Sequence, residues 1–69
     1  MKNLRMKSAR VGFDLSQEEL AERVGVTRQT IGMIEAGRFN PSLALCVAIC
    51  RVLGKTLNDL FWEEEPHDA

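Results

Sequence analysis

Apolar residues recur along most of this chain at intervals of three and four positions, the spacing that gives an α-helix one apolar face. No segment bounded by turn residues alternates between apolar and polar positions, as a half-buried strand would. We therefore predict an all-α fold, a compact five-helix bundle. The predicted helices span residues 3–11, 17–24, 28–36, 42–53 and 57–62.

Polar residues and glycines at the expected helix ends support these boundaries. Ser16 and Glu19 have the spacing of a capping box, in which each side chain bonds a backbone N–H group of the first turn. Thr27 is a favourable N-cap for the third helix. Gly12 and Gly25 are expected to end the first two helices, because glycine adopts the left-handed conformation at low cost.

The fourth predicted helix is apolar nearly all round. It begins after Pro41 and Ser42, which suit a helix start. We expect it either to be the central core element or to place one face against another subunit. Cys46 and Cys50 lie one helical turn apart within it and are expected to be reduced. Core packing is the default interpretation of these two thiols, and a redox or metal sensor is the alternative.

Length and composition indicate a single small globular domain over residues 1–69. Of the 69 residues, 45% are apolar and 28% are charged, which is too apolar for a disordered chain. A core this small is marginal by itself, so a partner subunit is expected. The longest apolar run is far shorter than the roughly 20 residues of a membrane span, and the N-terminus has no signal-peptide core. These features predict a soluble, cytoplasmic protein.

Charge is distributed unevenly along the chain, whose formal net charge is −1. Residues 1–38 carry seven bases and five acids, a balance of +2, whereas residues 39–69 carry two bases and five acids, a balance of −3. A basic surface can therefore form on the N-terminal half, which permits a polyanionic partner. The acidic tail, residues 63–69, is expected to fray.

The two helices expected on either side of Gly25 have the spacing of a helix-turn-helix, in which the second helix can lie in the DNA major groove. Ala21 is small where the two helix axes must approach each other, and Gly25 has no side chain where the chain reverses. Val26, Ile31 and Ile34 can fill the angle between the helices. Each of these residue types has a steric reason at its position.

A resemblance to a known family covers residues 15–43, whose sequence is LSQEELAERVGVTRQTIGMIEAGRFNPSL. This stretch resembles the core motif of Cro and phage-repressor type helix-turn-helix proteins, the XRE family of transcription regulators. The likeness extends more loosely over residues 4–62. It implies a lambda-repressor-like DNA-binding domain that binds double-stranded DNA as a homodimer and regulates transcription. Repression by occlusion is the expected direction, and activation by contact with polymerase is equally compatible with this chain.

The resemblance also implies roles for particular residues. Gln17, at the start of the second helix, corresponds to a glutamine that contacts a DNA phosphate. Residues 27–30 correspond to the exposed opening of the recognition helix. Arg38 and Asn40 correspond to a loop that contacts a second phosphate.

The chemistry of the side chains divides the recognition-helix residues into two groups. Arg28 can donate two hydrogen bonds to guanine O6 and N7, and Gln29 can pair with adenine N6 and N7. We expect these two residues to read bases, with Met33 touching a thymine methyl group. Thr27 and Thr30 are expected to contact phosphate.

One further correspondence and two departures from the family pattern concern structure. Arg10 and Glu35 match a buried ion pair that joins the first and third helices in the family. Gly32 and Ala9 depart from the family pattern, which commonly has a small polar residue and leucine at these positions. Glycine inside a helix costs roughly 1 kcal/mol relative to alanine, so Gly32 either permits a close approach to the DNA backbone or is tolerated.

Other classes of function remain as alternatives. The sequence shows no nucleophile beside a base and no glycine-rich phosphate loop, so we expect no enzymatic activity and no cofactor. His67 is the only histidine and has no companion ligand, so no metal site is predicted. The alternative function is a protein-interaction module, such as an antitoxin-like partner or an adaptor with secondary DNA binding, which the acidic C-terminal half favours. Phe61 and Trp62 suit either core closure or a dimer contact.

Overall fold

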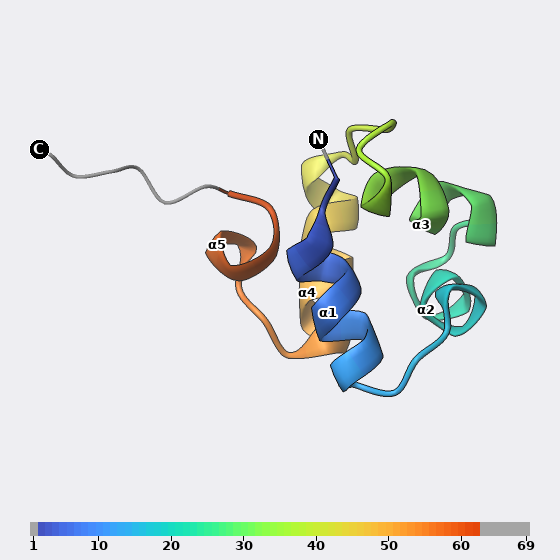
Figure 1. Ribbon diagram of the computed structural model, residues 1–69, viewed down its shortest axis with the longest axis horizontal. Helices are drawn as coiled ribbons and strands as arrows, with labels where there is room; N and C mark the ends of the chain where they lie inside the picture. Colours follow the sequence, from blue (N-terminus) through green and yellow to red (C-terminus); the bar gives the residue numbers. More distant parts are fainter. Residues whose placement is uncertain (1, 63–69) are drawn as a thin grey trace, which may run out of the picture.

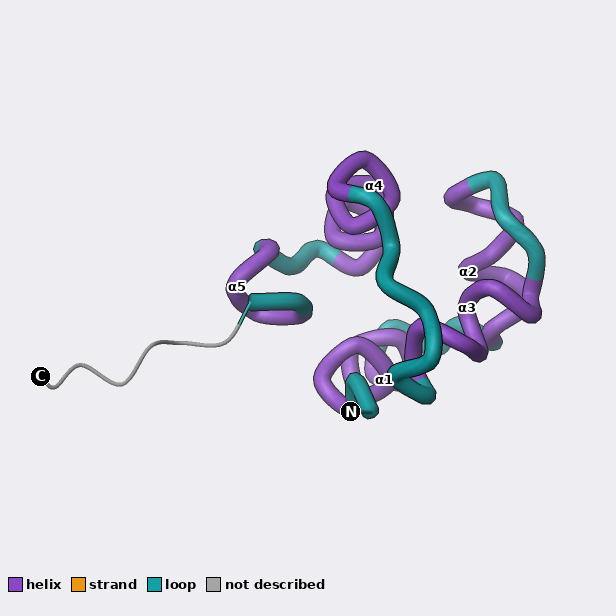
Figure 2. Tube along the Cα trace, turned by 90° about the horizontal axis from the view of Figure 1, so that it is seen from above, coloured by secondary structure: helices purple, strands orange, loops and turns teal. Residues whose placement is uncertain are grey.

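The computed structural model describes residues 2–62, and this part of the chain folds into five α-helices without a strand (Figure 1). The helices are α1 (Leu4–Gly12), α2 (Gln17–Val24), α3 (Arg28–Glu35), α4 (Leu43–Leu53) and α5 (Leu57–Leu60). In both views α2 and α3 lie at one end of the molecule, α5 lies at the other, and α1 and α4 lie between them (Figures 1 and 2). The predicted all-α fold class is confirmed.

One apolar core joins the five helices. α2 packs against α3 and α4, α1 packs against α3 and α5, and α5 also packs against α4. α4 buries Cys46, Ile49, Cys50 and Leu53, while Leu43 at its first turn is 62% exposed. α4 is therefore the central core element, which is the first of the two roles expected from its apolar sequence. The remaining buried apolar residues of the core are Met6, Leu15, Leu20, Ala21, Ile31, Ile34 and Leu60.

The ends of α2 follow the sequence prediction closely. The Ser16 hydroxyl accepts a hydrogen bond from the Glu19 N–H at 3.0 Å, and the Glu19 carboxylate accepts one from the Ser16 N–H at 2.8 Å. Gly25 ends the helix in the left-handed conformation, with φ 80°. Both the capping box and the glycine stop are thus confirmed.

The end of α1 differs from the prediction that Gly12 would stop this helix. Gly12 is the last helical residue, because the Phe13 N–H still donates to the carbonyl oxygens of Ala9 and Arg10. The chain reverses at Asp14, which has φ 64° and whose N–H bonds the Val11 carbonyl. Aspartate is among the few residue types other than glycine that adopt this conformation readily, so glycine was not required there.

The other boundaries shift by one or two residues. α3 ends at Glu35 with Ala36 as its cap, and α4 starts at Leu43 with Ser42 as its N-cap. α5 ends at Leu60 instead of extending to residue 62, because the N–H groups of Phe61 and Trp62 both bond the Leu57 carbonyl. The predicted frayed tail, residues 63–69, lies outside the described residues. None of the helices in residues 2–62 has the length and apolar character to cross a membrane.

Candidate nucleic-acid interface

The turn between α2 and α3 fixes the angle between these two helices. The N–H groups of Gly25 and Val26 both bond the Ala21 carbonyl, at 2.9 and 3.0 Å. Thr27 then caps α3, with its hydroxyl accepting from the Thr30 N–H at 3.2 Å. Ala21 is buried at the contact, and Val26 packs against the core. The geometry is that of the helix-turn-helix expected from the sequence.

α3 has an inner apolar face and an outer polar face. Ile31 and Ile34 are buried, whereas Arg28 and Gln29 are exposed at the first turn. Within residues 2–62 the Arg28 and Gln29 side chains form no hydrogen bond or ion pair. Met33, one turn further along, is half-buried. The first turn of α3 therefore presents a guanidinium and a carboxamide whose donors and acceptors are left to solvent or to a ligand.

Thr27 and Thr30 are linked to each other beside these two residues. Their hydroxyl oxygens lie 3.0 Å apart, within hydrogen-bond distance, in addition to the bond that caps the helix. Thr27 is exposed and Thr30 is half-buried. A hydroxyl group can both donate and accept, so these two hydroxyls retain hydrogen-bonding capacity toward an anion at the helix N-terminus.

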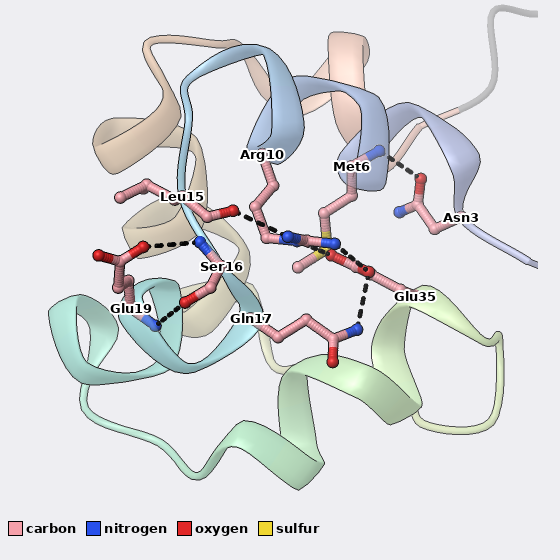
Figure 3. Close-up of polar contacts among 8 residues, drawn as sticks. All are labelled: Asn3, Met6, Arg10, Leu15, Ser16, Gln17, Glu19 and Glu35. Atoms are coloured by element: carbon pink, nitrogen blue, oxygen red, sulfur yellow. Dashed lines mark hydrogen bonds and ion pairs between the residues drawn. The ribbon is translucent and has the colours of Figure 1, made fainter.

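A buried ion pair ties α3 to α1 behind this surface (Figure 3). The Arg10 Nε atom lies 2.7 Å from Glu35 Oε2, and Arg10 Nη2 donates to Glu35 Oε1 at 3.2 Å. A third donor, Arg10 Nη1, bonds the Leu15 carbonyl at 2.8 Å, just before α2 begins. Arg10 and Glu35 are 8% and 6% exposed. Each charge is thus paired and hydrogen-bonded, which is the condition for keeping charges inside a protein.

Gln17 joins this cluster from the first turn of α2. Its side-chain nitrogen donates to Glu35 Oε1 at 3.1 Å, so one of its two N–H groups is used inside the protein (Figure 3). The half-buried side chain also lies across Gly32, where an added Cβ would meet the Gln17 amide atoms at 3.7 and 3.8 Å. Those are ordinary contact distances, so Gly32 is not required by crowding within the protein.

The loop after α3 carries the other two residues expected to contact phosphate. Gly37 has φ 77°, and the Arg38 N–H bonds the Met33 carbonyl at 2.8 Å. The Arg38 and Asn40 side chains are exposed. They follow the carboxyl end of α3, whereas Arg28 and Gln29 stand at its amino end, and the eight residues of this helix span about 12 Å. The candidate contact residues thus lie at both ends of one short helix.

A set of contacts made by the first residues was missed by the sequence analysis. The Asn3 N–H donates to the Glu35 carbonyl at 2.8 Å, and its side chain both caps α1 and bonds the Leu60 carbonyl at 2.8 Å. Arg5 bonds the carbonyl oxygens of Asn58 and Trp62 at 3.0 and 3.1 Å. Asparagine is a favoured N-cap residue, so its position at the start of the first predicted helix could have identified Asn3 as the cap of α1. No local pattern signals the contacts with α5.

The two cysteines lie inside the core and not at the candidate interface. Cys46 and Cys50 are free thiols, 8% and 5% exposed. Burial raises the pKa of both thiols, and the neighbouring Cys46 contributes to raising the pKa of Cys50. Raised pKa values keep the thiols protonated and unreactive, which suits packing. Within residues 2–62 no group of three or more potential metal ligands comes together, and His67 lies outside that range.

Comparison with known proteins identifies relatives of the whole described fold. A family model described as helix-turn-helix matches residues 6–60. The chain is 49% identical to YgzD, an HTH-type transcriptional regulator of Bacillus subtilis, over 94% of this chain and 97% of that protein. It is 35% identical to the immunity repressor protein of Bacillus phage phi105, over 87% of this chain and 42% of the repressor.

A solved structure extends the likeness to three dimensions. The restriction-modification controller protein C.AhdI from Aeromonas hydrophila superposes with a TM-score of 0.79 and 32% sequence identity. The match covers 86% of this chain and 89% of that protein.

Proposed function

This chain belongs to the XRE-type helix-turn-helix family of DNA-binding transcriptional regulators, and we propose that it reads its operator with Arg28 and Gln29 and acts as a repressor. The proposal assigns no catalytic reaction to the chain. It places the protein in the cytoplasm, where a regulator of this family meets its DNA. The relatives named as regulators and as a phage repressor support this role.

The observation that carries the proposal is the exposure of the first turn of α3. Arg28 and Gln29 extend from a helix whose opposite face is anchored in the core. Arginine pairs bidentately with guanine and glutamine with adenine in the major groove, and each good pair discriminates against a wrong base by about 1–3 kcal/mol. Met33 is half-buried one turn on and is assigned to a thymine methyl group.

Phosphate contacts are assigned to residues around this helix. Thr27 and Thr30 stand at its amino end, Gln17 keeps one free N–H group beside it, and Arg38 and Asn40 lie on the loop that follows it. These contacts position the helix and supply salt-dependent affinity without reading sequence. Backbone N–H groups at the starts of α2 and α3 add favourable sites for phosphate oxygens.

We further propose a homodimer. Within residues 2–62 a single chain leaves six large apolar side chains exposed, and a second copy would cover part of this surface. They are Leu4, Val11, Phe13, Phe39, Leu43 and Trp62. A two-fold dimer would bind a near-palindrome whose half-sites are about 10–10.5 base pairs apart.

Selection from a randomised duplex library, followed by fluorescence anisotropy over a salt series, tests the proposal. Arg28→Ala should reduce discrimination at one base position, whereas Gln17→Ala should weaken all sequences similarly. Arg51→Ala removes the same charge from an exposed position on α4 and serves as the matched control.

Two results would contradict the proposal. Absence of an enriched sequence with the folded protein would exclude specific reading. Equal losses from Arg28→Ala and Arg51→Ala would show that only overall charge matters. Sedimentation equilibrium checks the assembly, and a monomer at operator-binding concentrations would contradict the dimer.

A further inference from the structure

A groove lies beside the carboxyl end of α3, and its lining includes Asn3 and Arg5, which bond the α5 backbone, and Asn40 of the loop that follows α3. Its volume is about 890 Å³, and it lies between the first residues, the loop that follows α3 and the end of α5. None of the described residues that line it is acidic. Its apolar lining includes Leu4, Phe39, Pro41 and Phe61, and its two cations are Lys2 and Arg5.

The described residues end at Trp62, beside this groove. Phe61 lines the groove, and the carbonyl of the next residue, Trp62, accepts a hydrogen bond from Arg5 at 3.1 Å. Seven residues follow, of which Glu63, Glu64, Glu65 and Asp68 are acidic. At about 3.3–3.6 Å per residue an extended segment of this length reaches over 20 Å.

Charge and tethering together favour a contact between this segment and the groove. An exposed ion pair contributes little by itself, so several carboxylates near two cations are needed for a measurable effect. A short tether holds the segment at a local concentration in the millimolar range, which lowers the entropic cost of a weak contact. Leu4 is 61% exposed and Phe39 is 43% exposed, so the apolar lining is accessible to the segment.

We propose that the acidic segment 63–68 of this chain binds in the groove and competes there with DNA backbone phosphates. Asn40 lines the groove and stands on the loop assigned to phosphate contact, so both anions would approach the same place. The segment would lower DNA affinity, and salt would weaken its effect by screening. The competition rests on the proposed DNA-binding function, whereas binding of the segment in the groove does not.

Amide chemical shifts test the binding without DNA. The full chain is compared with a variant carrying Glu63→Gln, Glu64→Gln and Glu65→Gln. We expect shift changes concentrated at Leu4, Gly37 and Asn40, independent of protein concentration and abolished by about 1 M salt. A control with Asp14→Asn, Glu18→Gln and Glu22→Gln changes net charge equally and should leave the groove amides unchanged.

DNA affinity tests the competition. At low salt the glutamine variant should bind its operator roughly threefold to tenfold more tightly than the unaltered chain, and the gain should vanish at high salt. Combined with Lys2→Gln, the gain should fall by at least half. Combined with Lys7→Gln, which removes an exposed charge outside the groove, it should persist.

Several results would overturn the proposal. Unchanged groove amides would exclude the binding, and shifts that grow with protein concentration would assign the groove to a second copy. Equal gains in the Lys2→Gln and Lys7→Gln backgrounds would show general repulsion of DNA. Loss of DNA binding in every variant would overturn the proposed function and the competition with it, while the amide shifts would still decide whether the segment binds.

Discussion

Two arginine and glutamine pairs in this small protein have the same chemistry and opposite surroundings. Arg10 and Gln17 are turned toward Glu35, where their donors meet a carboxylate inside the molecule. Arg28 and Gln29 extend from the first turn of α3 and meet no partner within residues 2–62. The first pair supports the fold and the second is available to a ligand. The difference shows that function here depends on which polar groups the fold leaves unsatisfied.

Removing one member of the buried pair should have the largest effect. Arg10→Met leaves the Glu35 carboxylate buried without its cation, which we expect to cost about 3–5 kcal/mol in unfolding free energy. Urea denaturation measures it. The double variant Arg10→Met, Glu35→Leu should recover most of this loss, because an apolar pair has no unpaired charge. A small loss of stability in Arg10→Met would show that water hydrates the Glu35 carboxylate.

Truncating the exposed pair should affect binding and leave stability unchanged. Arg28→Ala and Gln29→Ala should each reduce discrimination at one base position by about 1–3 kcal/mol in competition binding. Urea denaturation should show that each variant changes the free energy of unfolding by no more than about 0.5 kcal/mol, since neither side chain contacts the core. A stability loss comparable to that of Arg10→Met would abolish the distinction between the two regions.

Gly32 lies on α3 between the exposed Arg28 and Gln29 and the buried Glu35, so a substitution there sharpens the comparison further. Gly32→Ala should stabilise the fold by roughly 0.4–1 kcal/mol, because alanine favours the helix and its Cβ meets only the Gln17 amide at ordinary distance. Gly25→Ala is the matched control and should destabilise by about 1–2 kcal/mol, because φ is 80° there. Destabilisation by Gly32→Ala would mean that the Gln17 side chain has no room to adjust.

The smallest expected effect concerns the exposed capping carboxylates. Backbone hydrogen bonds from Ser16 and Thr56 lower the pKa of Glu19 and Asp59, respectively, below their usual values. A carboxyl group with a lowered folded-state pKa contributes stability above its unfolded-state pKa and loses it as pH falls through the folded-state pKa. Glu19→Gln and Asp59→Asn should therefore reduce the fall of the urea midpoint between about pH 6 and pH 3. An unchanged slope would contradict the assignment.

The sequence predicted those parts of the fold that depend on neighbouring residues. The caps at Ser16 and Thr27 and the glycine stop at Gly25 follow from local hydrogen bonds and backbone conformation, and the structure contains all three. The end of α5 was missed because Phe61 and Trp62 continue an apolar pattern, while the Leu57 carbonyl accepts both of their N–H groups. The apolar pattern does not reveal where the backbone hydrogen bonds of the last turn end a helix.

The candidate site shows the same division. The resemblance predicted Arg10 and Glu35 as partners, and the structure places them 2.7 Å apart. The hydrogen bond from the Gln17 side chain to Glu35 was not predicted, because it joins residues 18 positions apart in the sequence. The contacts of Asn3 and Arg5 with α5 connect positions more than 50 residues apart, and they end on backbone carbonyls that carry no sequence signature.

The eight-residue length of α3 affects how the DNA sequence specificity of the protein could be changed. A helix this short is well below the 12–15 residues that hold a helical shape alone in water, so an excised peptide would neither fold nor select an operator. The surrounding helices supply its shape, and positions 28 and 29 take no part in that support. If positions 28 and 29 read the operator as proposed, new side chains there would retarget the protein to other operators while the scaffold remains intact.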